Sequence, residues 1–204
     1  SAIYDPVTTT DELIPSGETS SYRSNPVKLS EFALSRKDPQ YVPRAKEVLA
    51  VERLRRTNPG DPRVGEALLA HDPADTGLGS LVMALKPGDG SAREQAASCQ
   101  KVLGGFANIC YEYATKRYRS NCINWGILPF TIDQGTPFDY QPGDCVFVPG
   151  IRAAIEAGRE DIPAQVICRD GSVHDLLLHV RGLTQDEKEI ILDGCLMNYY
   201  AARM

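Results

Sequence analysis

The clearest hydrophobic pattern lies near the middle of the chain, where GSLVMALK (79–86) contains a short continuous apolar run. A run of this length after a glycine predicts a buried strand. Residues 91–100 are rich in alanine and predict a helix directly after the glycine-containing segment KPGDG. A surface helix is predicted at 42–56, VPRAKEVLAVERLRR, because its apolar positions have helical spacing and it carries both charges.

Polar and turn-forming residues separate these elements. Residues 1–30, with several threonines, serines and prolines, are expected to be extended or looped. Two prolines and two glycines in TNPGDPRVGE (57–66) predict a break in the chain. ADTGLG (74–79) predicts a second loop, which leads into the central strand.

The second half of the chain predicts mainly strands, followed by one helix. The strand candidates lie within 101–114, where helix and strand signals mix, and at 124–132, 140–150, 163–169 and 173–181. Arg169-Asp170-Gly171 joins the last two strands, and Asp-Gly is a strong hairpin signal. Thr184 and Glu187 have the spacing of a capping box and predict the start of a closing helix.

This order of elements predicts an α/β fold with both parallel and antiparallel strands. The 204 residues, 42% hydrophobic and 24% charged, fit one domain of generous size or two small ones. The net charge of −5 argues against nucleic-acid binding by bulk charge. No apolar stretch approaches the roughly 18 residues of a membrane helix, so we expect no membrane partner.

Cysteine spacing limits the possible metal chemistry. The six cysteines lie at least 11 residues apart, without a CxxC pair, and the histidines are not clustered. Zinc or an iron–sulfur cluster held by this chain alone is therefore not expected, and no metal ligands are predicted. Scattered cysteines in a chain of this size indicate reduced core residues of a cytoplasmic protein.

The segment KPGDGSAREQAAS (86–98) allows two interpretations. Ser91 and Glu94 have capping-box spacing, so the segment can be an ordinary helix start. It can also bind an anion, because Gly88 and Gly90 let the backbone approach a ligand and the helix start offers free N–H groups. Arg93 adds a permanent cation suited to carboxylate or phosphate.

At this point the sequence resembles a known family. GDGSAREQAA (88–97) resembles the GxGSSRE-type motif of the aconitase superfamily, in its C-terminal swivelling domain. TTTDELIP (8–15), RSNCINWGILPFTI (119–132) and YQPGDC (140–145) resemble further segments of that domain in the expected order. The resemblance covers about residues 5–200. It implies one domain over 1–204, with an insertion around 40–75.

The resemblance implies a three-layer β/β/α swivelling domain and the removal or addition of water on hydroxy polycarboxylates. By position, Ser91 would be the base that takes the proton beside a carboxylate, next to Gly90. Arg93 and Arg23 would bind substrate carboxylates, and Asp11, 12 residues before Arg23, would orient it by an ion pair. From its residue type alone, Asp11 could equally cap a turn.

Two positions depart from the family pattern. Ala92 replaces a second serine that helps hold a substrate carboxylate; alanine keeps the backbone N–H but loses a hydroxyl. One hydrogen bond to a charged group is worth roughly 1.5–3 kcal/mol. Pro87 stands where the family has a tyrosine. An altered substrate, a weaker enzyme or a lost activity would each follow, so the resemblance does not fix the substrate.

The family's [4Fe–4S] cluster takes the leaving hydroxyl and is held by cysteines in other domains. The resemblance therefore implies a partner: cluster-bearing domains of the same polypeptide, or a large subunit as in isopropylmalate isomerases. The absent initiator methionine and the TTTDEL opening favour the first. Two alternatives stay open, namely a small subunit of such an isomerase and a non-catalytic interaction or regulatory module that kept the fold.

Overall fold

The centre of the molecule is a set of parallel strands linked by helices. The computed structural model describes residues 1–204. β3 (Ser80–Ala84), β5 (Gly105–Cys110) and β6 (Leu128–Thr131) lie side by side in parallel, with β1 (Ala2–Ile3) on the outer side of β3. α5 (Arg93–Val102) and α6 (Lys116–Asn124) make the crossovers. The predicted central strand and the helix after it are confirmed.

Antiparallel strands extend the same sheet. β7 (Cys145–Phe147), β8 (Asp161–Ile167) and β9 (Val173–His179) complete a seven-stranded sheet in the order β1-β3-β5-β6-β9-β8-β7. One residue pair, Thr131 with His179, joins the parallel half to the antiparallel half. The hairpin predicted at Arg169-Asp170-Gly171 is present between β8 and β9. The α/β fold with mixed strands is therefore confirmed.

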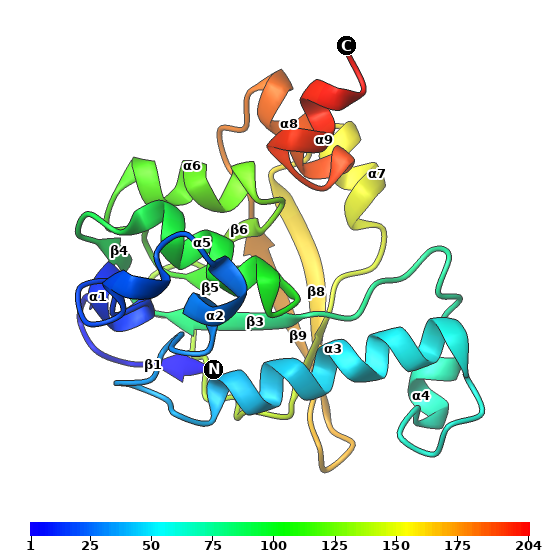
Figure 1. The fold of residues 1–204 in the computed structure, drawn as a ribbon. Coiled ribbons are helices and arrows are strands. Elements are labelled where there is room, and N and C mark those ends of the chain that lie inside the picture. The colour runs from blue at the N-terminus through cyan, green and yellow to red at the C-terminus, as the bar shows by residue number, and fades with distance from the viewer.

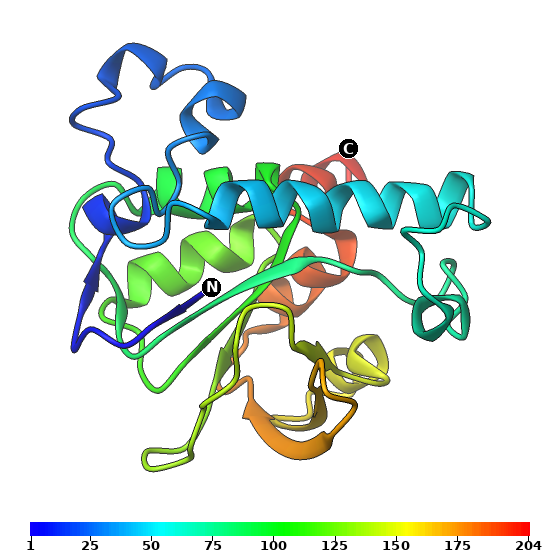
Figure 2. The ribbon, with the colours of Figure 1, turned by 90° about the horizontal axis from the view of Figure 1, so that it is seen from below.

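Two hydrophobic clusters lie on opposite faces of the parallel strands. In β3, Val82 and Ala84 belong to the helix-side cluster, whereas Met83 between them belongs to the strand-side cluster. This division follows from the two-residue period of a strand. Figure 2 shows the resulting layers, with α3, α5 and α6 on one side of the parallel strands and the curled antiparallel strands on the other.

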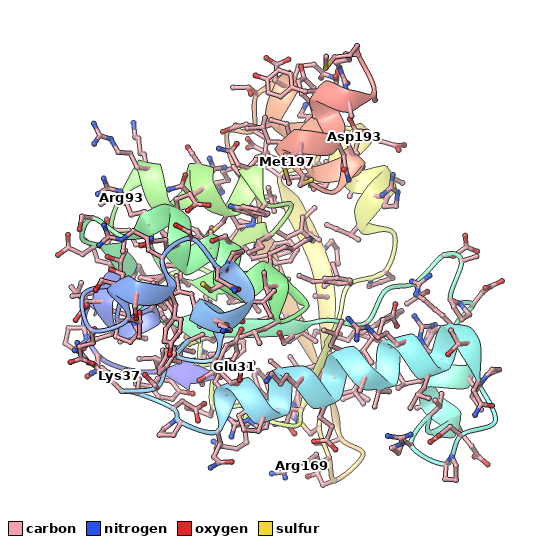
Figure 3. All side chains as sticks on the ribbon, in the orientation of Figure 1. Glu31, Lys37, Arg93, Arg169, Asp193 and Met197 are labelled. Atoms are coloured by element: carbon pink, nitrogen blue, oxygen red, sulfur yellow. The ribbon has the colours of Figure 1, made fainter.

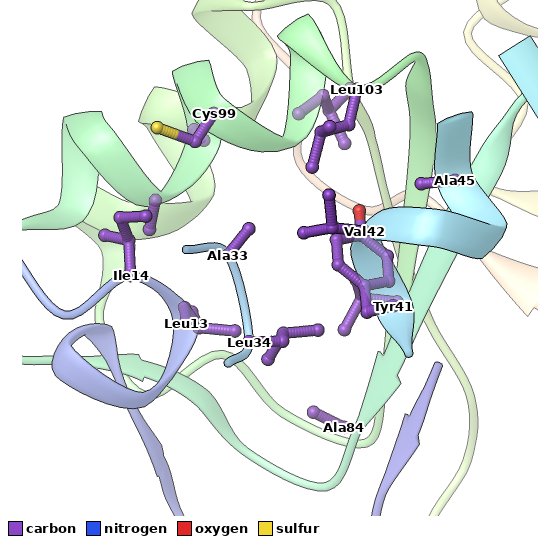
Figure 4. Close-up of a cluster of buried hydrophobic side chains, with 14 of the residues drawn as sticks. Leu13, Ile14, Ala33, Leu34, Tyr41, Val42, Ala45, Ala84, Cys99 and Leu103 are labelled. Carbon is purple, nitrogen blue, oxygen red and sulfur yellow. The ribbon is translucent and has the colours of Figure 1, made fainter. Parts of the chain in front are cut away.

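The helix-side cluster is built from distant parts of the chain. Figure 4 shows its side chains, which include Leu13, Leu34, Tyr41 and Cys99, converging from the N-terminal segment, α3 and α5. The strand-side cluster contains Met83, Ile109 and Phe130 from the parallel strands, packed with residues of β8 and β9. Each cluster contains more than ten buried residues, 18 and 12 respectively, so both faces of the parallel strands are covered.

The N-terminal segment has more structure than the sequence predicts. β2 (Thr8–Thr9) pairs in parallel with β4 (Pro87–Asp89), and α1 (Thr10–Leu13) follows with a capping box formed by Thr9 and Glu12. A short 3-10 helix, η1 (Ser20–Tyr22), and α2 (Pro26–Ser30) complete the segment. Figure 2 shows the stretch between α1 and α3 looping outward on the helix side.

Residues 41–79 form a projection that we call the α3–α4 arm. α3 (Tyr41–Thr57) confirms the predicted surface helix, and α4 (Glu66–Leu69) follows the predicted break. Inside the arm, buried Arg55 pairs with Glu52 and donates to the carbonyl oxygens of His71, at 3.0 Å, and Thr76. Figure 1 shows α4 on the side of the molecule opposite β4 and α1.

The C-terminal part is helical but is not a single helix. α7 (Ile151–Glu156) follows β7, and α8 (Gln185–Asp193) begins at the predicted capping box of Thr184 and Glu187. The chain then turns at Gly194, which has a φ of 92°, before α9 (Leu196–Ala201). The prediction of one closing helix is therefore wrong after residue 193. None of the helices combines the length and apolar character needed to cross a membrane.

Candidate active site

The segment that carries Ser91 is a tight turn, residues 86–92, which we call the glycine turn. It lies at the carboxyl end of β3 and runs through β4 into α5. Gly88 and Gly90 have φ angles of 101° and 128°, in the region that side chains disfavour. A Cβ atom on Gly88 would overlap Tyr118, and one on Gly90 would overlap Thr10. Both glycines are therefore required by the protein's own packing.

The Ser91 side chain does not cap α5. The helix begins at Arg93, its N-cap residue is Ala92, and no side chain caps it. Glu94 accepts a hydrogen bond from Nε1 of Trp125 at 3.1 Å and does not reach back to Ser91. The predicted Ser91–Glu94 capping box is therefore wrong, because the helix starts one residue later than that spacing requires. Ser91 is exposed, and the first N–H groups of α5 remain available to an anion.

Arg93 and Ala92 flank this exposed helix start in different ways. The half-buried Arg93 donates through Nη1 to the carbonyl oxygen of Gly90, so its guanidinium folds back over the glycine turn. Figure 3 shows Arg93 near the start of α5. Ala92 is half-buried and packs against the helix-side cluster. A hydroxyl at position 92 would therefore lie partly against apolar side chains.

Asp11 lies close to the glycine turn, but its partner is not the predicted one. Pairing of β2 with β4 places α1, which contains Asp11, beside the turn. The Asp11 carboxylate forms an ion pair with Arg36, which also contacts Glu18. The expected Asp11–Arg23 ion pair is therefore absent. Arg23 is exposed at the end of η1 and has no ion-pair partner.

Arg36 is a residue near this site that no motif in the sequence indicates. It precedes Lys37, which pairs with Asp5 at 3.2 Å and with Glu12 at 2.9 Å. Two adjacent cations thus face the adjacent acids Asp11 and Glu12. In the sequence, only the opposite charges of Asp11-Glu12 and Arg36-Lys37 could have indicated this contact. Oppositely charged residues occur at many other places in the chain, so this signal does not select these two pairs.

The cysteines do not form a ligand set for a cluster. Cys99, Cys110 and Cys122 are buried, and burial raises the pKa of the Cys99 and Cys122 thiols to about 12. Such thiols stay protonated at neutral pH, whereas cluster ligands are thiolates. No three His, Cys, Asp or Glu side chains lie close enough together to hold a metal ion. The residues of this chain therefore do not fit an iron–sulfur cluster.

Comparison with known proteins finds a family model that matches the middle of the chain. Residues 54–135, which include the whole glycine turn and α6, match the family model described as the aconitase C-terminal domain. These matched residues are similar to an aconitase C-terminal domain, in agreement with the motifs in the sequence. Aconitate hydratase A of Bradyrhizobium diazoefficiens is 28% identical to it over 120 residues, which are 57% of this chain. The chain spans only 13% of that relative's length.

A solved structure shares the fold of this chain. The 3-isopropylmalate dehydratase (leuD) of Methanocaldococcus jannaschii matches with a TM-score of 0.54 and 20% sequence identity. The match covers 99% of this chain and 92% of the other. At this identity the likeness concerns the fold, which agrees with the α/β swivelling domain that the sequence motifs imply.

Proposed function

We propose that this chain is the C-terminal domain of an aconitase-like hydro-lyase that dehydrates or hydrates a hydroxy polycarboxylate. The observation that carries the proposal is the glycine turn, where an exposed serine precedes an uncapped helix start beside an arginine. The family match at residues 54–135 includes this turn. The rest of the enzyme would supply the remainder of the reaction.

In this proposal Ser91 is the base that removes a proton from the carbon beside a substrate carboxylate. A serine hydroxyl ionises far above neutral pH, so the oxyanion needs stabilisation. Free N–H groups at the start of α5 and the nearby Arg93 guanidinium are groups that provide it. Ser91 has no side-chain partner that would have to be displaced first.

Arg93 and Arg23 would bind substrate carboxylates. Arg93 is held by only one backbone carbonyl, so several of its N–H donors stay available for a carboxylate. Arg23 has no partner, and it would meet substrate from the looped-out N-terminal segment. The backbone N–H of Ala92 remains a donor. Asp11 would act only indirectly, through Arg36 rather than Arg23.

The domain would work with a cluster-bearing partner. We infer that a [4Fe–4S] cluster is held by other domains of the same polypeptide or by a large subunit, where it would supply Lewis-acid chemistry toward the leaving hydroxyl. Residues 1–204 would form one swivelling domain, with the region around 40–75 as an insertion that projects as the α3–α4 arm. A cytoplasmic location remains part of the same proposal.

The proposal is tested on the full polypeptide, or on this chain with its large partner, after cluster reconstitution. Alkene formation is followed with a panel of hydroxy di- and tricarboxylates. We expect Ser91→Ala to lower kcat by about 100-fold or more, the scale of a lost general base. Ser172→Ala, at a half-buried serine in the β8–β9 turn, is the control and should keep full turnover. Equal turnover in wild type and Ser91→Ala would reject Ser91 as the base.

A second candidate is a module that kept the fold and lost the reaction. Ala92 favours it, because the side chain at this position packs against the helix-side cluster and offers no hydroxyl to a substrate. No turnover on any substrate, with an intact cluster, would support this candidate. Ala92→Ser is then the variant to test, since recovered turnover would show that the missing hydroxyl is the cause.

A further inference from the structure

A chain of buried polar side chains runs beneath the glycine turn. Gln100 in α5 donates through Nε2 to Oδ1 of Asn108 in β5 at 2.7 Å, and Nδ2 of Asn108 donates to the Tyr118 hydroxyl at 3.3 Å. All three residues are at most 5% exposed. Buried amides are costly unless they are hydrogen-bonded, so these bonds fix the orientation of the Tyr118 ring from within the core.

Tyr118 transmits this orientation to the glycine turn. Its ring fills the space beside the Gly88 Cα atom that a side chain would occupy. The N-cap residue of α6, Thr115, donates to the carbonyl oxygen of Gly88 at 3.1 Å and accepts from the Tyr118 N–H at 3.1 Å. The first turn of α6 therefore contacts Gly88 on both its Cα atom and its carbonyl.

The opposite side of the turn is held by the N-terminal segment. The Thr8 N–H donates to the carbonyl oxygen of Lys86 at 3.0 Å, and the Thr10 side chain packs against Gly90. Ser91 follows immediately and makes no side-chain hydrogen bond of its own. Its place is therefore set by the backbone at Gly88 and Gly90, and not by contacts of its hydroxyl.

We propose that Tyr118 is a positioning residue for Ser91, which holds the glycine turn at Gly88 through the buried Gln100–Asn108–Tyr118 hydrogen bonds. The inference rests on the proposed function in one respect, namely that Ser91 is the base. The conformation of the turn itself depends on Tyr118 whatever reaction the domain serves. Two measurements distinguish the effect of Tyr118 on turnover from its effect on the conformation of the glycine turn.

The first measurement is steady-state kinetics of the full polypeptide with its cluster. Tyr118→Phe keeps the ring against Gly88 but removes the hydroxyl that Asn108 holds. We expect kcat to fall about tenfold with KM changed less than twofold, because small displacements of a reacting group cost rate more than binding. Ile123→Val, in the same helix and fully buried, is a control of similar destabilisation and should keep kcat. Tyr113→Phe removes a buried hydroxyl that has no partner and should also keep it.

The second measurement is amide hydrogen exchange of the same full polypeptide, which requires no turnover. We expect Tyr118→Phe to accelerate exchange in residues 86–92 at least fivefold relative to Ile123→Val, with β8 and β9 unchanged. Should Tyr118→Phe fail to fold, Gln100→Met removes the other end of the hydrogen-bond chain and should act in the same direction. Unchanged exchange in the turn, or equal acceleration in Ile123→Val, would overturn the inference. Full activity of Ser91→Ala would reject the proposed base but leave this exchange result to decide the role of Tyr118.

Discussion

At the scale of single residues, burial determines how the core cysteines behave. Cys99 and Cys122 are fully buried, and burial raises the pKa of both thiols to about 12. Burial also raises the pKa of the Cys110 thiol. A protonated thiol in this setting packs as a small apolar side chain, and it is a poor nucleophile and a poor metal ligand.

Because of these buried thiols, we expect the free energy of unfolding to fall at alkaline pH. An unfolded thiol has its ordinary value of 9.0, so above that pH the unfolded state releases protons that the folded state retains. The stabilisation is complete below pH 9 and declines as pH rises toward about 12. Each buried thiol should lower the free energy of unfolding by about 1.4 kcal/mol per pH unit in this window.

Urea unfolding of the full polypeptide at several pH values measures this slope. Cys99→Ala should make the slope shallower by the contribution of one thiol. Ile127→Val, which changes a fully buried side chain of the same cluster, should lower stability without changing the slope. An identical slope in wild type and Cys99→Ala would contradict the assignment of this pH dependence to buried thiols.

The sequence locates Ser91 and Arg93 in the turn, but not their partners. The Ser91–Glu94 spacing fits a capping box, yet the helix begins at Arg93 and Glu94 bonds to Trp125 instead. Nothing local distinguishes a helix that starts at one residue from a helix that starts at the next. The Asp11–Arg36 ion pair joins residues 25 positions apart, and only the tertiary fold brings them together.

At the scale of elements, strong local sequence signals correctly predicted helices and strands, whereas weak signals did not. The continuous apolar run before the glycine turn and the Asp-Gly hairpin gave β3 and the β8–β9 pair. The apolar spacing continues past Gly194 and therefore predicted one closing helix. Gly194 adopts a left-handed conformation, and α8 ends there. β1 and β2 have two residues each, which is too short for any periodic pattern.

The end of α6 and the end of α8 meet backbone to backbone, and this contact predicts a strong effect at Gly126. Its φ is 66°, and a Cβ atom there would overlap the carbonyl of Gly194. Gly126→Ala combines left-handed strain with an overlap that only a helix shift relieves, so stability should fall by about 3 kcal/mol or more. Gly182→Ala is the matched control, with the same φ of 66° and no atom within 4 Å. It should cost about 1 kcal/mol. Equal losses in chemical denaturation would show that the close approach is unimportant.

At the scale of the whole molecule, the α3–α4 arm is attached through a buried charge. Arg55 is 2% exposed and ties α3 to the loop that returns to β3. Arg55→Met leaves the carbonyls of His71 and Thr76 without this donor, and it should cost about 3 kcal/mol. Arg56→Met removes a largely exposed partner of the same Glu52 and should cost less than about 1 kcal/mol.

Amide hydrogen exchange will locate the part of the chain that Arg55→Met destabilises. In Arg55→Met, residues 58–79 should lose protection while β5 and β6 keep theirs, and Arg56→Met should resemble wild type. Uniform loss of protection over the whole chain would contradict a local role for Arg55.

The parallel pairing of β1 with β3 has a kinetic consequence. Ala2 lies opposite Met83, whereas β3, β5 and β6 follow one another within residues 80–131. Loop closure favours contacts that are near in sequence, so the β3–α5–β5–α6–β6 unit should nucleate folding. The N-terminal segment would dock late, after the glycine turn has already met α6. During refolding, Tyr118 would therefore engage Gly88 before Thr10 reaches Gly90, and the nascent turn would acquire its two supports in that order.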